Sequence, residues 1–249
     1  MTNQEFSNEF DVLYNNIMSN QAPGLDEYEK SVFLTKAQDE LVKNYFNPKG
    51  NKYGEGFDDN EKRQIDFSMI MRNTSISSGF GDGVFDSRGK IITLPTDALM
   101  ILNEYAIVTR KQNSTDPDSV QQTNLRLIVV PLEYKEYSRL MSKPYKRPLK
   151  FQAWRLLDNS DTQKKAEVIV GPNDTLTAYN IRYIKKPRAI ILSDLEGVTL
   201  DNKTTAQTCE LDSILHPEIL QRAVELAKIA YEGDVNQTQL HMTAGQRSE

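Results

Sequence analysis

The sequence predicts an α+β fold in which an N-terminal helical hairpin and a C-terminal helix form a bundle, with a mainly antiparallel β insertion. Apolar residues recur at helical spacing through residues 2–46. Alternating apolar residues and turn residues then dominate from residue 73 to residue 200. Helical spacing returns in a sharply started segment near residue 217. Helices, then strands, then a helix are typical of the α+β class.

The N-terminal hairpin is expected to contain two capped helices. Thr2 and Glu5 have the spacing of a capping box, in which hydroxyl and carboxylate satisfy each other's backbone amides. Asp26 and Glu29 repeat this spacing after the helix-breaking pair Pro23-Gly24. The apolar stripes of the two helices are Phe6, Phe10, Leu13, Tyr14 and Ile17, then Leu34, Ala37, Leu41 and Tyr45.

The middle of the chain is expected to be β-rich. Residues 61–72 fit either a strand or a helix, and the acidic residues before them favour a helix. A short helix is predicted over Glu133–Met141, and the polar segment 111–122 is predicted to be a hairpin tip. The predicted strands are 91–94, 98–109, 125–130, 151–157, 166–170 and 176–184.

The closing helix has clear start and stop signals. Pro217 suits the first helical position, and Gly233 suits a helix end. We therefore predict four parts: a helical part over 1–72, a β-rich region over 73–200, a closing helix over 201–235 that packs on the first part, and a disordered tail over 236–249.

The composition argues against several classes of protein. The chain has 249 residues and a formal net charge of −5, whereas proteins that grip nucleic-acid phosphates are usually basic. Cys209 is the only cysteine, so one chain forms neither a disulfide nor a cysteine-based zinc site. No signal peptide is evident, and no apolar run approaches the roughly 20 residues that span a bilayer. We expect folding in a cytoplasm and no membrane partner.

No pattern of residues indicates catalysis, a cofactor or a metal ion, so we predict that the protein is not an enzyme. His216 precedes the closing helix, where capping or packing is its expected role, and His241 lies in the polar tail. The glycine-rich run from Gly79 to Gly83 lacks the following helix of a phosphate loop, which favours a hairpin or bulged loop. The acidic pairs lack the spacing of a calcium-binding loop; they are Asp58 with Asp59 and Asp116 with Asp118.

Basic and aromatic residues are interleaved between residues 135 and 155, and a second basic cluster follows residue 181. Such a pattern can bind nucleic acid, or an acidic protein surface such as that of the N-terminal hairpin. Head-to-tail contacts between copies that close a ring are one interpretation, and two ordinary solvated faces are the other. The candidate interface residues are Lys135, Arg139, Lys143, Lys146, Arg147, Lys150, Trp154, Arg182, Lys185, Lys186, Leu220, Val224 and Tyr231.

Three stretches, over 24–38, 94–104 and 183–231, occur in an order that resembles a known family. The family is that of the head-to-tail connector proteins, also called adaptor or ring proteins, of short-tailed bacteriophages, and of crAss-like phages in particular. The resemblance covers residues 1–233, and the family has no catalytic residues to transfer.

The resemblance implies a structural virion protein at the junction of capsid and tail, assembled in the cytoplasm of the bacterial host. About twelve copies would form a homo-oligomeric ring beneath the portal protein and extend the DNA channel. Downstream tail or ring proteins would be further partners, and genomic DNA would pass without specific recognition. The alternatives are another neck or tail component, such as a second ring or a stopper, and a nucleic-acid-binding accessory protein.

Overall fold

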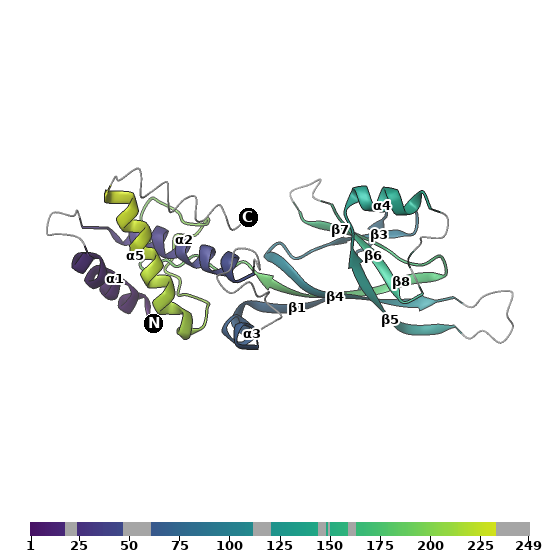
Figure 1. Ribbon diagram of the computed structural model, residues 1–249, viewed down its shortest axis with the longest axis horizontal. Helices are drawn as coiled ribbons and strands as arrows, with labels where there is room; N and C mark the ends of the chain where they lie inside the picture. The colour runs from purple at the N-terminus through teal and green to yellow at the C-terminus, as the bar shows by residue number, and fades with distance from the viewer. Residues whose placement is uncertain are drawn as a thin grey trace. The chain divides into compact units, whose positions relative to one another are not determined.

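The computed structural model describes residues 1–17, 24–46, 61–111, 121–143, 148, 150–158 and 163–232. Its chain divides into two compact units, which we call the helical unit (Met1–Ile70 with Pro187–Glu249) and the sheet unit (Met71–Lys186). The sheet unit is therefore one continuous insertion in the chain of the helical unit (Figure 1). The predicted tail over 236–249 and most of the predicted hairpin tip lie outside the described residues.

The helical unit is built on α1 (Asn3–Ile17), α2 (Glu27–Phe46) and α5 (His216–Glu232). Both predicted capping boxes are formed: the Glu5 amide donates to Thr2 Oγ1 over 3.3 Å, and the Glu29 amide donates to Asp26 Oδ1 over 2.7 Å. The apolar faces of the three helices are buried together, with Phe6, Phe10, Leu34, Ile219 and Ala223 fully enclosed. The same unit contains α3 (Glu61–Asp66) and single 3-10 turns at Ser68–Ile70 and Ser213–Leu215.

Polar side chains on α2 bind an extended segment of the chain at residues 188–192. Gln38 Nε2 donates to the Arg188 carbonyl over 2.8 Å, Thr35 Oγ1 accepts from the Ile190 amide over 3.1 Å, and Ser31 Oγ accepts from the Leu192 amide over 3.1 Å. These side chains stand at successive turns on one face of the helix. They satisfy backbone groups that would otherwise be buried without partners.

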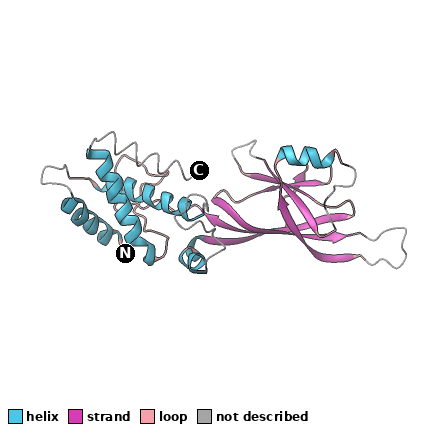
Figure 2. Ribbon diagram, in the orientation of Figure 1, coloured by secondary structure: helices cyan, strands magenta, loops and turns pink. Residues whose placement is uncertain are grey.

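The sheet unit contains one mixed sheet of eight strands in the order β1-β8-β4-β5-β6-β7-β3-β2, drawn as magenta arrows in Figure 2. Every neighbouring pair is antiparallel except β5 with β6, which α4 (Tyr134–Met141) connects. A parallel pair needs such a crossover. The strands are β1 (Met71–Ile76), β2 (Gly81–Asp82), β3 (Gly89–Thr93), β4 (Ala98–Arg110), β5 (Gln122–Pro131), β6 (Gln152–Asp158), β7 (Lys165–Ile169) and β8 (Asp174–Lys185).

The two faces of the sheet bury separate apolar clusters. The sheet curls around the larger cluster, to which β3, β4, β5, β7 and β8 all contribute. Helix α4 covers part of the other face (Figure 1). There Tyr137 meets Trp154, Leu156 and Ile169. The sheet unit is thus stabilised by two hydrophobic cores of its own.

The predicted architecture was wrong. The β region is inserted in the chain of the helical unit, but it is not an addition to a helical bundle. It forms a compact unit of its own, built on a large curled mixed sheet of eight strands. The helical unit is also more than a bundle, since α2 packs on the extended segment 188–192 as well as on α5. The ambiguous segment 61–72 is a short helix and a 3-10 turn that run into β1.

Candidate assembly interface

Helix α4 displays a stripe of positive charge. Lys135, Arg139 and Lys143 are exposed at spacings of four residues, on the helix and just beyond its last turn. On the opposite side of the helix Tyr137 is buried, and its ring meets Trp154 edge-on at 6.4 Å. Because the buried side fixes the rotation of the helix, Lys135 and Arg139 point away from the sheet, and Lys143 is exposed two residues beyond the helix end. We call Lys135, Arg139 and Lys143 the basic stripe.

The other predicted interface residues fall into three groups. Trp154, Leu220 and Val224 lie in the cores of their own units. Lys150 is exposed beside the Phe151 ring, while Arg182, Lys185 and Lys186 lie at and just beyond the end of β8. Lys146 and Arg147 lie outside the described residues, as does the side chain of Tyr231. Among the predicted residues that the structure describes, Lys135 and Arg139 lie together on the exposed side of α4, and Lys143 follows the end of that helix.

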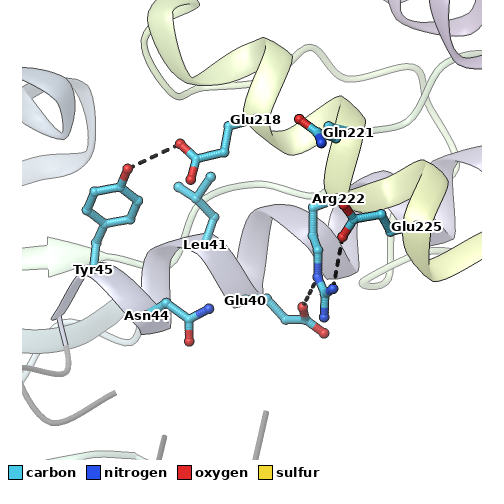
Figure 3. A pocket seen from close by; sticks show the side chains of 8 residues that line it. All are labelled: Glu40, Leu41, Asn44, Tyr45, Glu218, Gln221, Arg222 and Glu225. Atoms are coloured by element: carbon cyan, nitrogen blue, oxygen red, sulfur yellow. Dashed lines mark hydrogen bonds and ion pairs between the residues drawn. The ribbon is translucent and has the colours of Figure 1, made fainter. Parts of the chain in front are cut away.

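A polar groove with a volume of about 240 Å³ lies between α2 and α5 (Figure 3). Arg222 donates to Glu40 over 2.8 Å and to Glu225 over 3.2 Å, so one guanidinium serves two carboxylates. The Glu218 carboxylate accepts from the Tyr45 hydroxyl over 3.1 Å. The remaining lining residues, Leu41, Asn44 and Gln221, carry no charge. We call this hollow the acidic groove, because three carboxylates line it against one cation.

The two units carry opposite net charges. In the helical unit Lys and Arg number 12 and Asp and Glu 23, which gives −11. In the sheet unit the corresponding numbers are 18 and 12, which gives +6. The overall charge of −5 is therefore the sum of a strongly negative helical unit and a positive sheet unit.

Apolar side chains are exposed next to α4. Val84 and Phe85 have exposed fractions of 71% and 50%. The Phe85 ring lies 4.9 Å from that of Tyr134, at the start of α4. Exposed aromatic residues beside basic ones are typical of protein interfaces.

The glycine-rich run forms part of an anion-binding loop that the chain itself occupies. The amides of Val84, Phe85 and Asp86 donate to the Glu167 carboxylate over 3.0–3.2 Å. Burial opposes the ionisation of Asp86, but its hydrogen bonds from Arg88 lower its pKa overall. Since Glu167 fills the loop, this loop has no room for a phosphate group, and the role of a bulged loop suits it.

A buried polar network crosses the larger core, and sequence reasoning missed it. Arg155 Nε on β6 donates to the Glu104 carboxylate on β4 over 2.9 Å, and the Tyr179 hydroxyl on β8 donates to the same carboxylate. Burial, followed by the charge of Glu104, raises the pKa of Tyr179 far above its ordinary value. The residues are 24 to 75 positions apart along the chain, so no local pattern could have shown that they meet.

His216 is a packing residue at the start of α5. It is buried, its Nε2 lies 3.1 Å from the Leu211 carbonyl, and its ring lies 5.1 Å from that of Phe6. Burial lowers its pKa. His241 and the acidic pairs at 58–59 and 116–118 lie outside the described residues. Within the described ranges, no cluster of three His, Cys, Asp or Glu side chains is arranged to hold a metal ion.

Throughout the part of the chain that the structure describes, no helix is both long enough and apolar enough to cross a bilayer.

Comparison with known proteins identifies the family. A family model described as phage tail ring protein 3/4 matches residues 1–239. The chain is 49% identical over 262 aligned positions to "Ring protein 4/5" of Bacteroides phage crAss001, with both chains covered completely. It is 32% identical to "Ring protein 3" of the same phage, with 92% of this chain and 96% of the relative covered. The predicted resemblance is confirmed: the chain belongs to the phage tail ring protein 3/4 family and is a ring protein of the crAss-like phage type.

Proposed function

We propose that this ring protein connects the capsid portal to the tail and extends the DNA channel between them. Its copies assemble head to tail into a closed homo-oligomeric ring of about twelve subunits. A contact between two different surfaces of identical chains gives a closed ring when the rotation between neighbours closes. The portal protein lies on one side of the ring and further tail proteins on the other. The ring is part of the virion and assembles in the cytoplasm of the infected host.

The opposite charges of the two units are the observation that supports this proposal most directly. A helical unit of −11 and a sheet unit of +6 give each copy two different surfaces that attract each other. Like surfaces repel, which disfavours contact between two helical units or between two sheet units and favours contact between unlike units of neighbouring copies. The net negative charge also suits a channel lining along which duplex DNA moves without adhering.

The direct test is to mix the purified chain with the portal protein of the same phage and to image the particles by electron microscopy. We expect class averages of a portal with an added symmetric ring, from which the copy number can be counted. Bare portals beside free chains would contradict the connector position. Retention of the chain on duplex DNA, with steep salt dependence, would favour the accessory nucleic-acid-binding function instead.

A further inference from the structure

We propose that the basic stripe on α4 of one copy docks into the acidic groove between α2 and α5 of the next copy. This contact rests on the proposed ring function and specifies the surfaces that hold neighbouring copies together. Both surfaces are present on every chain, one on each unit. A contact between two different surfaces of identical chains is heterologous and can propagate around a ring.

The stripe has the length and chemistry of an inserting element. Lys135 and Arg139 lie one turn apart on α4, about 6 Å along the helix axis, and Lys143 follows two residues beyond the end of the helix, so the three backbone positions cover up to about 12 Å. All three side chains are exposed, and Arg139 makes a loose ion pair with Glu136 at 3.6 Å. Such an exposed pair is weak and readily exchanged for a stronger partner.

The groove has matching dimensions and charge. Glu218 and Glu225 lie seven positions apart on α5, which corresponds to about 10 Å along the helix. Glu40 faces them from α2, as Figure 3 shows. Arg222 offsets one of these three charges, so the lining carries a net charge of −2. The Glu218 carboxylate meets a hydroxyl in the described structure, so its charge can attract an incoming Lys or Arg.

The aromatic pair beside the stripe adds apolar area to the contact. Phe85 and Tyr134 are 50% and 39% exposed, and their rings touch each other at the start of α4. Charged residues steer and orient an encounter, whereas buried aromatic residues supply much of its strength. The stripe and the aromatic pair together form one docking surface on the sheet unit.

The test uses two charge-reversed chains. The variant K135E/R139E has an acidic stripe and an acidic groove, and E218K/E225K has a basic stripe and a basic groove. Sedimentation velocity at low salt should show that each variant alone associates at least roughly tenfold more weakly than the wild type. An equimolar mixture should associate again, because alternating copies restore opposite charges at every contact.

A matched control separates docking from overall charge. K111E/R126E changes the sheet unit by the same charge at two exposed positions outside α4 and outside the candidate interface residues, and it should associate like the wild type. Equal weakening by this control, or no recovery in the mixture, would overturn the inference. A wild-type chain that stays monomeric at high concentration and low salt would also overturn it.

The failure of this inference can be told apart from a failure of the proposed function. If K135E/R139E formed normal rings on the portal, the inferred contact through α4 would be contradicted, whereas the proposed connector function would be supported. If loss of association on reversal of the stripe were accompanied by loss of duplex DNA binding in a fluorescence anisotropy assay, the stripe would be a nucleic-acid surface, which contradicts the inference.

Discussion

At the scale of single residues, the loop around Glu167 shows how glycine permits a close approach of backbone to a carboxylate. A Cβ atom at Gly83 would lie 2.3 Å from the Asp86 carbonyl oxygen and 2.5 Å from Glu167 Oε1. At Gly89 it would lie 2.2 Å from the same carboxylate oxygen. Any side chain at either position must displace the loop from Glu167.

We therefore expect Gly83→Ala to lower the free energy of unfolding by about 1–3 kcal/mol, the usual range for overpacking. Urea denaturation followed by circular dichroism would measure it. Gly81→Ala is the matched control, because the nearest atom to a Cβ there is Ile91 Cβ at 3.4 Å, and its effect should be small. Equal stability of the two variants would show that the loop relaxes without cost.

Cys209 offers a second prediction at this scale. Burial raises the pKa of its thiol to about 11, and its Sγ donates to Gln38 Oε1 over 3.4 Å. At pH 8 the thiolate is then roughly a hundredfold rarer than in an unfolded chain, so a disulfide reagent should react correspondingly slowly. Absorbance kinetics with and without urea would measure the ratio, and similar rates in both would contradict the prediction.

The same shift has a consequence for stability. The Cys209 thiol ionises at a lower pH in the unfolded chain than in the folded one. The stability that the un-ionised thiol contributes to the fold is therefore complete below the unfolded pKa, and it is lost as pH rises through about 11.

At the scale of elements, α2 combines an apolar stripe that the sequence revealed with a polar one that it did not. Leu34, Ala37 and Leu41 are buried as their spacing predicted. Ser31 and Gln38 are also fully buried, although polar residues are usually exposed. Each of them also hydrogen-bonds to a backbone group more than 140 positions away. Ser31 and Gln38 are therefore buried despite their polarity, because they supply hydrogen bonds to the backbone of residues 188–192.

Replacement of Gln38 tests this polar stripe. Gln38→Ala removes the donor to the partly buried Arg188 carbonyl and should cost about 1–3 kcal/mol of unfolding free energy. Hydrogen exchange should show faster opening of the segment 188–192 in the variant. Gln4→Ala removes an exposed amide that donates to Asn8 Oδ1 over 3.2 Å, and it should change stability by less than about 0.5 kcal/mol. Equal effects of both changes would contradict the role given to the stripe.

The strands were easier to predict than their arrangement. All six predicted strands have counterparts in the sheet, because alternation and turn residues are local signals. The order in which they pair depends on contacts such as β1 with β8, which join residues more than 100 positions apart. Gly81–Asp82 belongs to the glycine-rich run that was expected to form a hairpin or bulged loop, and it pairs with the antiparallel strand β3 as the short strand β2. Tertiary pairing thus decided what local preference could not.

At the scale of the whole molecule, the separation of charge was visible only in part. The basic region 135–155 and the acidic hairpin can be read from the sequence. Their assignment to separate compact units required the structure, because residues 187–232 return to the helical unit. Among the candidate interface residues, the exposed Lys135, Arg139 and Lys143 were identified from composition, whereas the acidic groove brings together residues of α2 and α5 that are far apart in sequence.

Association between copies should weaken as salt is added, because the attraction between the units acts over distances that ions screen. The screening length falls from about 10 Å at 0.1 M salt to about 3 Å at 1 M. We expect wild-type self-association, measured by sedimentation velocity, to decline continuously over this range. The K135E/R139E variant serves as the comparison, because with its stripe reversed it should lose less affinity over the same range. Association of the wild type that strengthens with salt would mean that the Phe85 and Tyr134 surface dominates the contact, since salt favours the burial of apolar area. The sign of the salt dependence therefore decides whether the charge of the two units or the aromatic pair holds the copies together.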